Sequence, residues 1–483
     1  MTYTEQMAAF LEQTRFEDLP PKVVHLAKIS ILDALGCALG GFSLDRSVIS
    51  RQVMLSFGGN AEATVLGSGQ KSSCLSAAYI NANMGVALAS DEFFCTIGHI
   101  GVPTLFPALA LAERYKSTGK DLITSFVVGY EVAARIGLSV GKLTRIVDNK
   151  VEALPVLGTA SWHAMASVAS VGNLIRLSRE QAVNALGLQA HHAPVPTGRH
   201  VMLSPVTSMN RFYDTGWMAL GGIVSGLMSQ KGYTSFPAPG ILDGDYGFWR
   251  MIGAEKCDFN LMVDKLGDKW WFMEQSFKPW PGDGYIMHPL TALDILLRKH
   301  KILPHEVEKV TIRGGLAYPN FFNQSPKTES DAAFSVPHCA AMLILGVPPG
   351  PEWQTPENLI SARVAELRSK ITLEIDPAVA RVISAQIMKF PGIIFEAPTT
   401  VELNARGRTF TESVKYHLGN NPWSVEMTMT DEQLEEKFRV NSASVLPAST
   451  VWRHRVEEII GACRDLENIG NVQALTRLCM TGE

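Results

Sequence analysis

The sequence lacks the short motifs that define several large functional classes. None of its 40 glycines falls in a G-x-G-x-x-G or Walker pattern, and the nearest match, "GSGQKSS" (67–73), is too short. This argues against a nucleotide-binding loop. The seven cysteines are scattered through 483 residues and show no C-x-x-C spacing. Scattered, odd-numbered cysteines are typical of reduced thiols, so we expect a cytoplasmic protein.

Charge and hydropathy exclude two further classes. Charged residues make up only 19% of the chain, the formal net charge is −4, and no long basic run is present. Because a phosphate-binding face needs clustered Lys and Arg, we expect no nucleic-acid partner. No uninterrupted apolar run approaches the roughly 20 residues that span a bilayer. The polar, acidic first residues do not resemble a signal peptide, so we expect no membrane association.

What the sequence has is a long region of helical periodicity. Segments 22–42 and 121–138 repeat apolar residues at helical spacing and are rich in Ala, Gly and Ser. Ser178 is followed three residues later by Gln181, a capping-box pattern that predicts the start of a helix. We therefore predict that residues 1–272 are mainly helical.

The pattern changes after residue 272. Four segments alternate polar and apolar residues like half-buried strands: 306–315, 369–376, 399–405 and 408–416. The last two flank a short turn at Gly407. Amphipathic helices then return at 421–483. The predicted fold is mainly α: a large all-helical domain formed by both chain ends (1–272 and 421–483), with an inserted smaller α+β lid domain (273–420) that contains an antiparallel sheet.

One segment gathers titratable residues in apolar surroundings. "ASDEFFCTIGHIG" (89–101) contains Asp91, Glu92, Cys95 and His99. The residues alone leave three interpretations open: a metal site, an acid–base catalytic site, and a solvated loop between helices. Asp91, Cys95 and His99 recur every four residues, but H-x-x-x-H and C-x-x-C spacings are absent, so we expect no metal. Cys95 has no cation nearby to activate it and is expected to be a bystander.

Three further polar clusters lie among apolar segments. They occupy 191–205, 208–217 and 277–289, and the last one falls at the proposed domain boundary. Small-molecule sites tend to form between domains, which favours the acid–base interpretation. "GLSVG" (137–141) matches G-x-S-x-G, but no strand precedes it, so we interpret it as a helix terminus.

The order of several longer motifs resembles the MmgE/PrpD family over nearly the whole chain. The motifs are "LAKISILDALGCALGG", "EATVLGSGQKSSCLSAAYINA", "FSVPHCAAMLILG" and, after the final hairpin, "EEKF". That family includes 2-methylcitrate dehydratase, cis-aconitate decarboxylase and iminodisuccinate epimerase. The resemblance implies the two-domain fold described above and a homodimer. It also implies catalysis on di- or tricarboxylic acids without metal or organic cofactor.

The resemblance also implies site residues. The family's acidic pair falls on Asp91 and Glu92, its histidine on His99 and a lysine position on Arg211, and Lys278 and His288 remain in the lid segment. Other positions depart from the family pattern. Ala89 and Phe93 replace an aspartate and a threonine. Glu152 lies near a position where decarboxylase-like members carry a histidine. The loss of that histidine, together with the replacement of the family's lysine by Arg211, favours a substrate other than cis-aconitate.

We assign roles to these residues by their chemistry. His99 is predicted to move a proton. Asp91 is predicted to hold or polarise the His99 ring. Arg211 is predicted to bind a substrate carboxylate, because a guanidinium does so bidentately. Asp283 and Tyr285 are predicted to act from the lid side. The resemblance implies that substrate binding falls to Glu92, Glu152, Lys278, His288 and Tyr318, the last of which lies near a lid tyrosine of decarboxylase-like members.

The predicted function is a cofactor-independent lyase, either a dehydratase or a decarboxylase, that acts on a small di- or tricarboxylic acid. An epimerase or isomerase of an iminodisuccinate-like substrate is the alternative. A non-catalytic relative that retains the fold also stays open.

Overall fold

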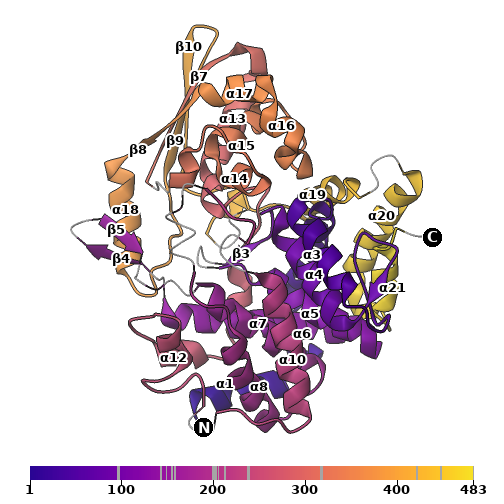
Figure 1. Ribbon diagram of the computed structural model, residues 1–483. Coiled ribbons are helices and arrows are strands. Elements are labelled where there is room, and N and C mark those ends of the chain that lie inside the picture. The colour runs from indigo at the N-terminus through magenta and orange to yellow at the C-terminus, as the bar shows by residue number, and fades with distance from the viewer. Residues whose placement is uncertain are drawn as a thin grey trace.

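The computed structural model describes most of the chain, and Figure 1 shows a large helical body below a smaller body that carries the sheet. The described residues are 1–483 except 95–97, 142–143, 148–149, 154–155, 157–158, 198–203, 205, 211–213, 237–239, 316–318, 420–422, 446–448 and 482–483. For 144–147, 150–153 and 159–160 only the backbone is described.

The helical body contains the helices of the first half of the chain. They are α1 (Tyr3–Gln13), α2 (Pro21–Gly40), α3 (Asp45–Ser56), α4 (Cys74–Ala87), α5 (Gly101–Tyr115), α6 (Gly119–Val140), α7 (Thr159–Leu174), α8 (Arg179–His192) and α10 (Thr215–Gln230). Small residues let these helices approach closely: a Cβ on Gly129 of α6 would lie 2.6 Å from Ser170 Cβ of α7. The predicted capping box of Ser178 and Gln181 is confirmed at the start of α8.

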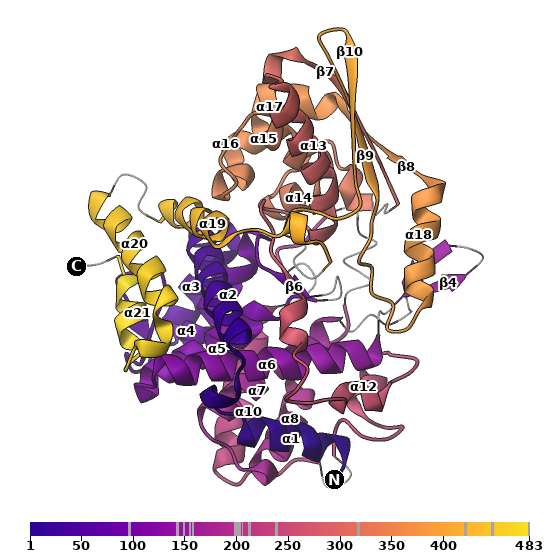
Figure 2. The ribbon, with the colours of Figure 1, turned by 180° about the vertical axis from the view of Figure 1, so that it is seen from behind.

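The last helices of the chain pack on the first ones. They are α19 (Asp431–Ala443), α20 (Thr450–Arg464) and α21 (Gln473–Leu478). Figure 2 shows α19 beside α2. Leu434 and Phe438 of α19 belong to the same hydrophobic core as Leu32 and Leu35 of α2. Both ends of the chain therefore contribute to one core.

Two helices of this body are long and apolar enough to cross a membrane by length and composition alone. They are α2 and α6, and 83% and 100% of their apolar windows are buried inside the protein. Such burial is typical of core helices, so this is weak evidence for a membrane span.

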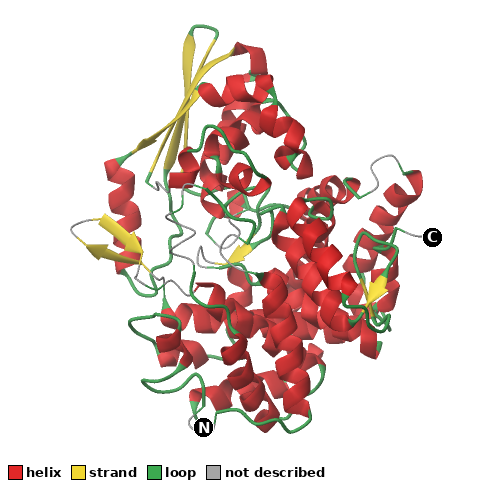
Figure 3. Cartoon of the chain, in the orientation of Figure 1, coloured by secondary structure: helices red, strands yellow, loops and turns green. Residues whose placement is uncertain are grey.

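The lid carries a four-stranded sheet in the order β10-β9-β7-β8. The strands are β7 (Val307–Gly314), β8 (Ile371–Ile375), β9 (Thr399–Ala405) and β10 (Arg408–Val414), and all four predicted strand segments are confirmed. Val401, Leu403 and Ala405 alternate toward a core shared with α13 (Met287–His300). Arg406 and Gly407 form the β9–β10 turn with φ of 56° and 64°. Figure 3 shows that the long strands gather in the lid.

One feature of the sheet differs from the prediction. The sheet is mixed rather than wholly antiparallel, because β8 runs parallel to β7. The connection between these strands contains α14 (Glu329–Phe334), α15 (Val336–Ile344), α16 (Pro356–Ile360) and α17 (Ala362–Ser369). A helical crossover of this kind returns the chain to the end of the sheet where it started, which is what parallel pairing needs.

A short strand pair joins the two bodies. β3 (Phe93–Phe94) pairs antiparallel with β6 (Gln275–Ser276), which leads into the lid. Figure 2 shows β6 between the bodies. The pairing brings the titratable segment that begins at Asp91 to the junction of the helical body and the lid.

Candidate active site

Asp91 and His99 lie against each other at this junction. His99 Nδ1 is 3.0 Å from Asp91 Oδ2 and 2.7 Å from the carbonyl oxygen of Glu92. Helical spacing does not produce this contact. Phe94 forms a β-bridge with Gly98, so the segment folds back on itself and returns His99 to Asp91.

This geometry sets how the His99 ring can act. A proton on Nδ1 faces the Glu92 carbonyl, beside the Asp91 carboxylate, so Nε2 is the nitrogen that can exchange a proton with a substrate. The His99 side chain is 19% exposed, whereas that of Asp91 is 4% exposed. A buried carboxylate behind a partly exposed imidazole is an arrangement suited to general acid–base chemistry.

Lys278 fixes the charge and position of Asp91. Burial alone would raise the pKa of the Asp91 carboxyl, but the Lys278 ammonium and His99 hold it below its usual range. Lys278 Nζ lies 3.6 Å from Asp91 Oδ1 and donates to the carbonyls of Ala89 (2.7 Å) and Gly282 (3.3 Å). These three acceptors match the three protons of the ammonium. Lys278 therefore anchors this segment from the lid side.

Glu92 points away from His99, into the helical core. Its Oε1 accepts hydrogen bonds from the backbone N–H groups of Ile100 (3.0 Å) and Gly101, and Tyr130 donates to Oε2 (2.9 Å). Burial raises the pKa of the Glu92 carboxyl to about 7, despite the hydrogen bond from Gly101. Glu92 thus caps the start of α5, directly after His99.

His163 of α7 supports His99 from the helical side, and the sequence reasoning missed it. Its Nε2 accepts a hydrogen bond from the His99 backbone N–H (3.2 Å). Burial lowers the pKa of His163 well below its usual value, so the ring is neutral. A Cβ on Gly98 would collide with this nitrogen, which explains the glycine. The sequence did not indicate a functional role for His163, because a single histidine in an Ala-rich helix is typical of a core residue.

His417, which follows β10, approaches from the lid and was also missed. Its ring centroid lies 5.2 Å from that of Phe93, and Phe93 also contacts the His99 ring at 6.3 Å. Burial lowers the pKa of His417 to about 4, while its Nδ1 lies 2.8 Å from the Leu418 carbonyl oxygen. The lid therefore places a neutral imidazole against Phe93, the residue whose ring also contacts His99.

Asp283 lies next to this site but uses its carboxylate locally. Asp283 Oδ1 accepts a hydrogen bond from the Tyr285 N–H (2.9 Å) and so caps the short helix η3 (Gly284–Ile286). The preceding N–H of Gly282 donates to the Ala89 carbonyl (3.2 Å). The turn that contains Asp283 is thus attached to the backbone just before Asp91.

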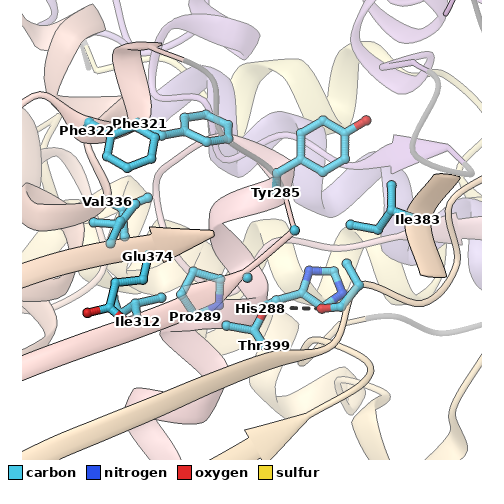
Figure 4. A pocket seen from close by; sticks show the side chains of 14 residues that line it. Tyr285, His288, Pro289, Ile312, Phe321, Phe322, Val336, Glu374, Ile383 and Thr399 are labelled. Atoms are coloured by element: carbon cyan, nitrogen blue, oxygen red, sulfur yellow. Dashed lines mark hydrogen bonds between the residues drawn. The ribbon is translucent and has the colours of Figure 1, made fainter. Parts of the chain in front are cut away.

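Tyr285 and His288 line a cavity of about 50 Å³ inside the lid. Figure 4 shows both side chains together with the apolar wall that includes Ile312, Phe321 and Ile383. Neither ring nitrogen of His288 has a hydrogen-bond partner among the described residues, and burial lowers the pKa of His288 well below its usual value. Its ring contacts that of His417 at 4.9 Å, which connects the cavity wall to the site.

The remaining predicted residues are described in part or not at all. Arg211, Tyr318 and Cys95 lie outside the described residues. Glu152 lies in β5 (Lys150–Ala153), where only its backbone is described, paired with Arg145 of β4 (Thr144–Val147). In Figure 1 this hairpin lies beside α18 (Pro377–Met388) of the lid. In the described part of the chain, no group of three or more His, Cys, Asp or Glu side chains could hold a metal ion.

A helical body, a lid and a carboxylate–histidine pair at their junction form the arrangement of an enzyme with its active site between two domains. Residues 5–259 match the MmgE/PrpD N-terminal domain and residues 280–464 match the MmgE/PrpD C-terminal domain. The chain therefore belongs to the MmgE/PrpD family, as the motifs predicted.

Curated relatives match the chain over nearly its full length. Cis-aconitate decarboxylase from Homo sapiens is 26% identical over 98% of this chain and 94% of the relative. Cis-aconitate decarboxylase from Aspergillus terreus is 24% identical over 98% and 95%. The cis-aconitate decarboxylase-like protein oryM from Aspergillus oryzae is 22% identical over 99% and 97%.

Proposed function

We propose that this chain is a lyase that decarboxylates a small di- or tricarboxylic acid without a cofactor, with His99 as the acid–base group. The observation that carries this proposal is the buried Asp91 carboxylate 3.0 Å from the partly exposed His99 ring. The lyase class follows from membership of the MmgE/PrpD family and from the full-length relatives named as decarboxylases. Those names favour decarboxylation over dehydration.

The proposed reaction uses His99 as an acid. The bond between the departing carboxylate and the carbon skeleton breaks, CO2 leaves, and the electron pair stays on the skeleton. The protonated His99 ring then gives the Nε2 proton to that carbon. Asp91 stabilises the imidazolium before the transfer, because its own pKa is held low and it stays ionised. Dehydration would use the neutral ring as a base beside a carboxylate.

The substrate also needs a cation to bind the carboxylate that it keeps. Lys278 is 1% exposed and its protons already face three oxygens of the protein. We therefore assign this task to Arg211, whose guanidinium suits a carboxylate. The assignment rests on residue type and on the family register.

Turnover of a defined set of acids tests the proposal. The purified chain is incubated in D2O with cis-aconitate, 2-methylcitrate or iminodisuccinate, and products are followed by proton NMR together with CO2 release. We expect CO2 and one carbon-bound deuterium per turnover from an acid of this class, with chelation having no effect. Loss of activity on chelation, or racemisation without CO2 release, would contradict the proposal.

A further inference from the structure

A second buried lysine reaches the segment that carries Asp91. Lys437 of α19 donates from Nζ to Asp33 Oδ1 of α2 (2.6 Å) and to the carbonyl oxygen of Ser90 (2.7 Å). The side chains of Lys437 and Asp33 are 3% and 1% exposed. The two residues come from opposite ends of the chain and meet directly behind the candidate active site.

Close packing of α2 against α19 makes this contact possible. A Cβ on Gly36 would lie 2.8 Å from the Phe438 ring, and one on Gly40 would lie 3.1 Å from Asn441 Cβ. The missing side chains let the helices approach, so that Lys437 can extend past α2 to the loop. The sequence motifs that contain Asp33 and Lys437 are therefore joined in space, although they lie at opposite ends of the chain.

The buried charges around this loop alternate in sign. Asp33 pairs with Lys437, and Asp91 pairs with Lys278. Burial disfavours the Lys437 ammonium, yet its pKa is raised because the Asp33 carboxylate lies against it and the Asp91 carboxylate lies nearby. Lys437 is therefore charged when it holds the Ser90 carbonyl.

We infer that Lys437 and Asp33 are positioning residues that aim Asp91 at His99. Lys278 holds the carbonyl of Ala89 and Lys437 holds the carbonyl of Ser90, so two ammonium groups fix adjacent peptides immediately before Asp91. Ala89 has a left-handed φ of 56°, which costs a non-glycine residue free energy and persists only where the surroundings impose it. As a role in catalysis, this inference rests on the proposed function.

Stability alone does not account for the arrangement. Replacing a buried ion pair by apolar residues is often neutral or stabilising, so such a pair needs another reason to be present. The second hydrogen bond of Lys437, to Ser90 and not to another side chain, supplies that reason. Through this hydrogen bond, the packing of α19 against α2 fixes the position of the Ser90 backbone.

Two variants separate positioning from stability. Lys437→Met removes the ammonium and leaves Asp33 buried without its cation, so both kcat and the melting temperature are expected to fall. Asp33→Asn/Lys437→Met removes both charges, so the melting temperature is expected to recover. The Ser90 carbonyl still lacks its donor, so kcat should stay roughly 10²-fold below that of the native chain with KM little changed, as expected for a misplacement of about 1 Å. If kcat recovers together with the melting temperature, the inference is overturned.

Arg439→Met is the matched control. Arg439 lies two residues further along α19 and donates to Glu457 at 2.6 Å, with 34% of its side chain exposed. Removing this cation from the same helix should leave kcat unchanged. A loss of kcat equal to that of Lys437→Met would show a general effect of α19 and would contradict a specific role for Lys437.

A crystal structure of the double variant gives a readout that does not depend on turnover. The Ser90–Asp91 backbone is expected to shift, and the contact between Asp91 Oδ2 and His99 Nδ1 is expected to lengthen beyond hydrogen-bonding distance. An unmoved pair would overturn the inference even with an active enzyme. Failure of the native chain to convert any of the acids would instead contradict the proposed function, while leaving this structural comparison intact.

Discussion

Two networks of buried charge differ in where they end: one lies in the helical body and the other at its junction with the lid. In the first, Arg135 of α6 donates to Glu131 Oε1 at 2.7 Å, and both side chains are 0% exposed. Arg135 also donates to the carbonyls of Asp264 (2.8 Å) and Lys269 (2.7 Å), while Glu131 accepts from the Phe272 N–H (2.8 Å). All of these contacts join protein groups to one another, so this network ties the segment before the lid to α6.

The second network, which consists of Lys278, Asp91 and His99, ends at a partly exposed side chain. Lys278 and Asp91 are buried like Glu131 and Arg135, but the chain of contacts continues to His99, whose ring is 19% exposed. Buried charge by itself therefore does not identify a site. A buried charge becomes useful for chemistry when it supports a titratable group that can still meet a substrate. The two networks are expected to respond differently to substitution.

His99→Gln should have the largest effect on activity. Glutamine can still donate a hydrogen bond but cannot gain and lose a proton, and loss of a general acid–base group typically costs about 10²–10⁴-fold in rate. We expect kcat to fall by this factor, while the melting temperature changes little because His99 is partly exposed. Steady-state kinetics and thermal unfolding of the same preparation provide the measurement.

His454→Gln is the matched histidine control. His454 lies on α20 with 79% of its side chain exposed, 3.5 Å from Glu458. Its replacement should leave kcat and the melting temperature unchanged. Near-native turnover by His99→Gln would remove the distinction between the two networks and would make the contact between Asp91 and His99 a structural one.

Arg135→Met should show the opposite pattern. Removing one partner of a buried ion pair leaves the other charge uncompensated, which typically costs about 3–5 kcal/mol of unfolding free energy. We expect this loss in urea unfolding, with kcat per folded molecule close to native at a temperature where the variant stays folded. A variant with native stability but strongly reduced kcat would place the Glu131–Arg135 network in the site.

The sequence was sufficient for those parts of the site that are close along the chain. Asp91 and His99 are eight positions apart in one unusual segment, so their residue types alone indicated chemistry. Lys437 and His417 could not be found in this way, because the folding of chain ends and lid brings them to the site. His163 gave no separate signal, since one histidine in an apolar helix does not change the periodicity that predicts the helix.

The fold, too, was predictable only where its signal is local in the sequence. Alternating residues predicted β7, β8, β9 and β10 from local sequence, and β9 shows the alternation of burial most clearly. The direction of β8 depends on how α14 to α17 cross between the strands, and strand periodicity carries no information about that path. The contact between Asp91 and His99 was not predictable for a related reason, because it depends on the Phe94–Gly98 bridge and on the pairing of β3 with β6, which is distant in sequence.

Glu92→Gln should change the pH dependence of stability by a smaller amount. The Glu92 carboxyl has a pKa of about 7 in the folded protein, against a usual 4.5, because it is buried. Between these values the folded state holds more protons than the unfolded state, so this group makes the unfolding free energy fall as the pH rises. Glutamine removes that dependence and keeps an oxygen to accept from Ile100 and Gly101.

We therefore expect native and Glu92→Gln proteins to be most similar near about pH 4.5, and the variant to gain relative stability up to about pH 7. Urea unfolding at several pH values across this window measures the difference. A constant difference between the two proteins would mean that Glu92 stays ionised in the fold, in which case its contacts with Tyr130 and Gly101 are those of a charged carboxylate.

Ser139→Ala should have the smallest effect, and it tests the G-x-S-x-G match directly. Ser139 lies near the end of α6, is 0% exposed, and donates from Oγ to the Ile136 carbonyl at 2.8 Å. A nucleophilic serine must instead present its hydroxyl at a sharp strand-to-helix turn. Alanine favours the helix and loses one hydrogen bond, so we expect a change of about 1 kcal/mol or less in unfolding free energy. The kcat should equal that of the native chain. A large loss of turnover with an intact fold would make Ser139 a reacting group. Burial of a side chain would then no longer distinguish structural from catalytic residues in this protein.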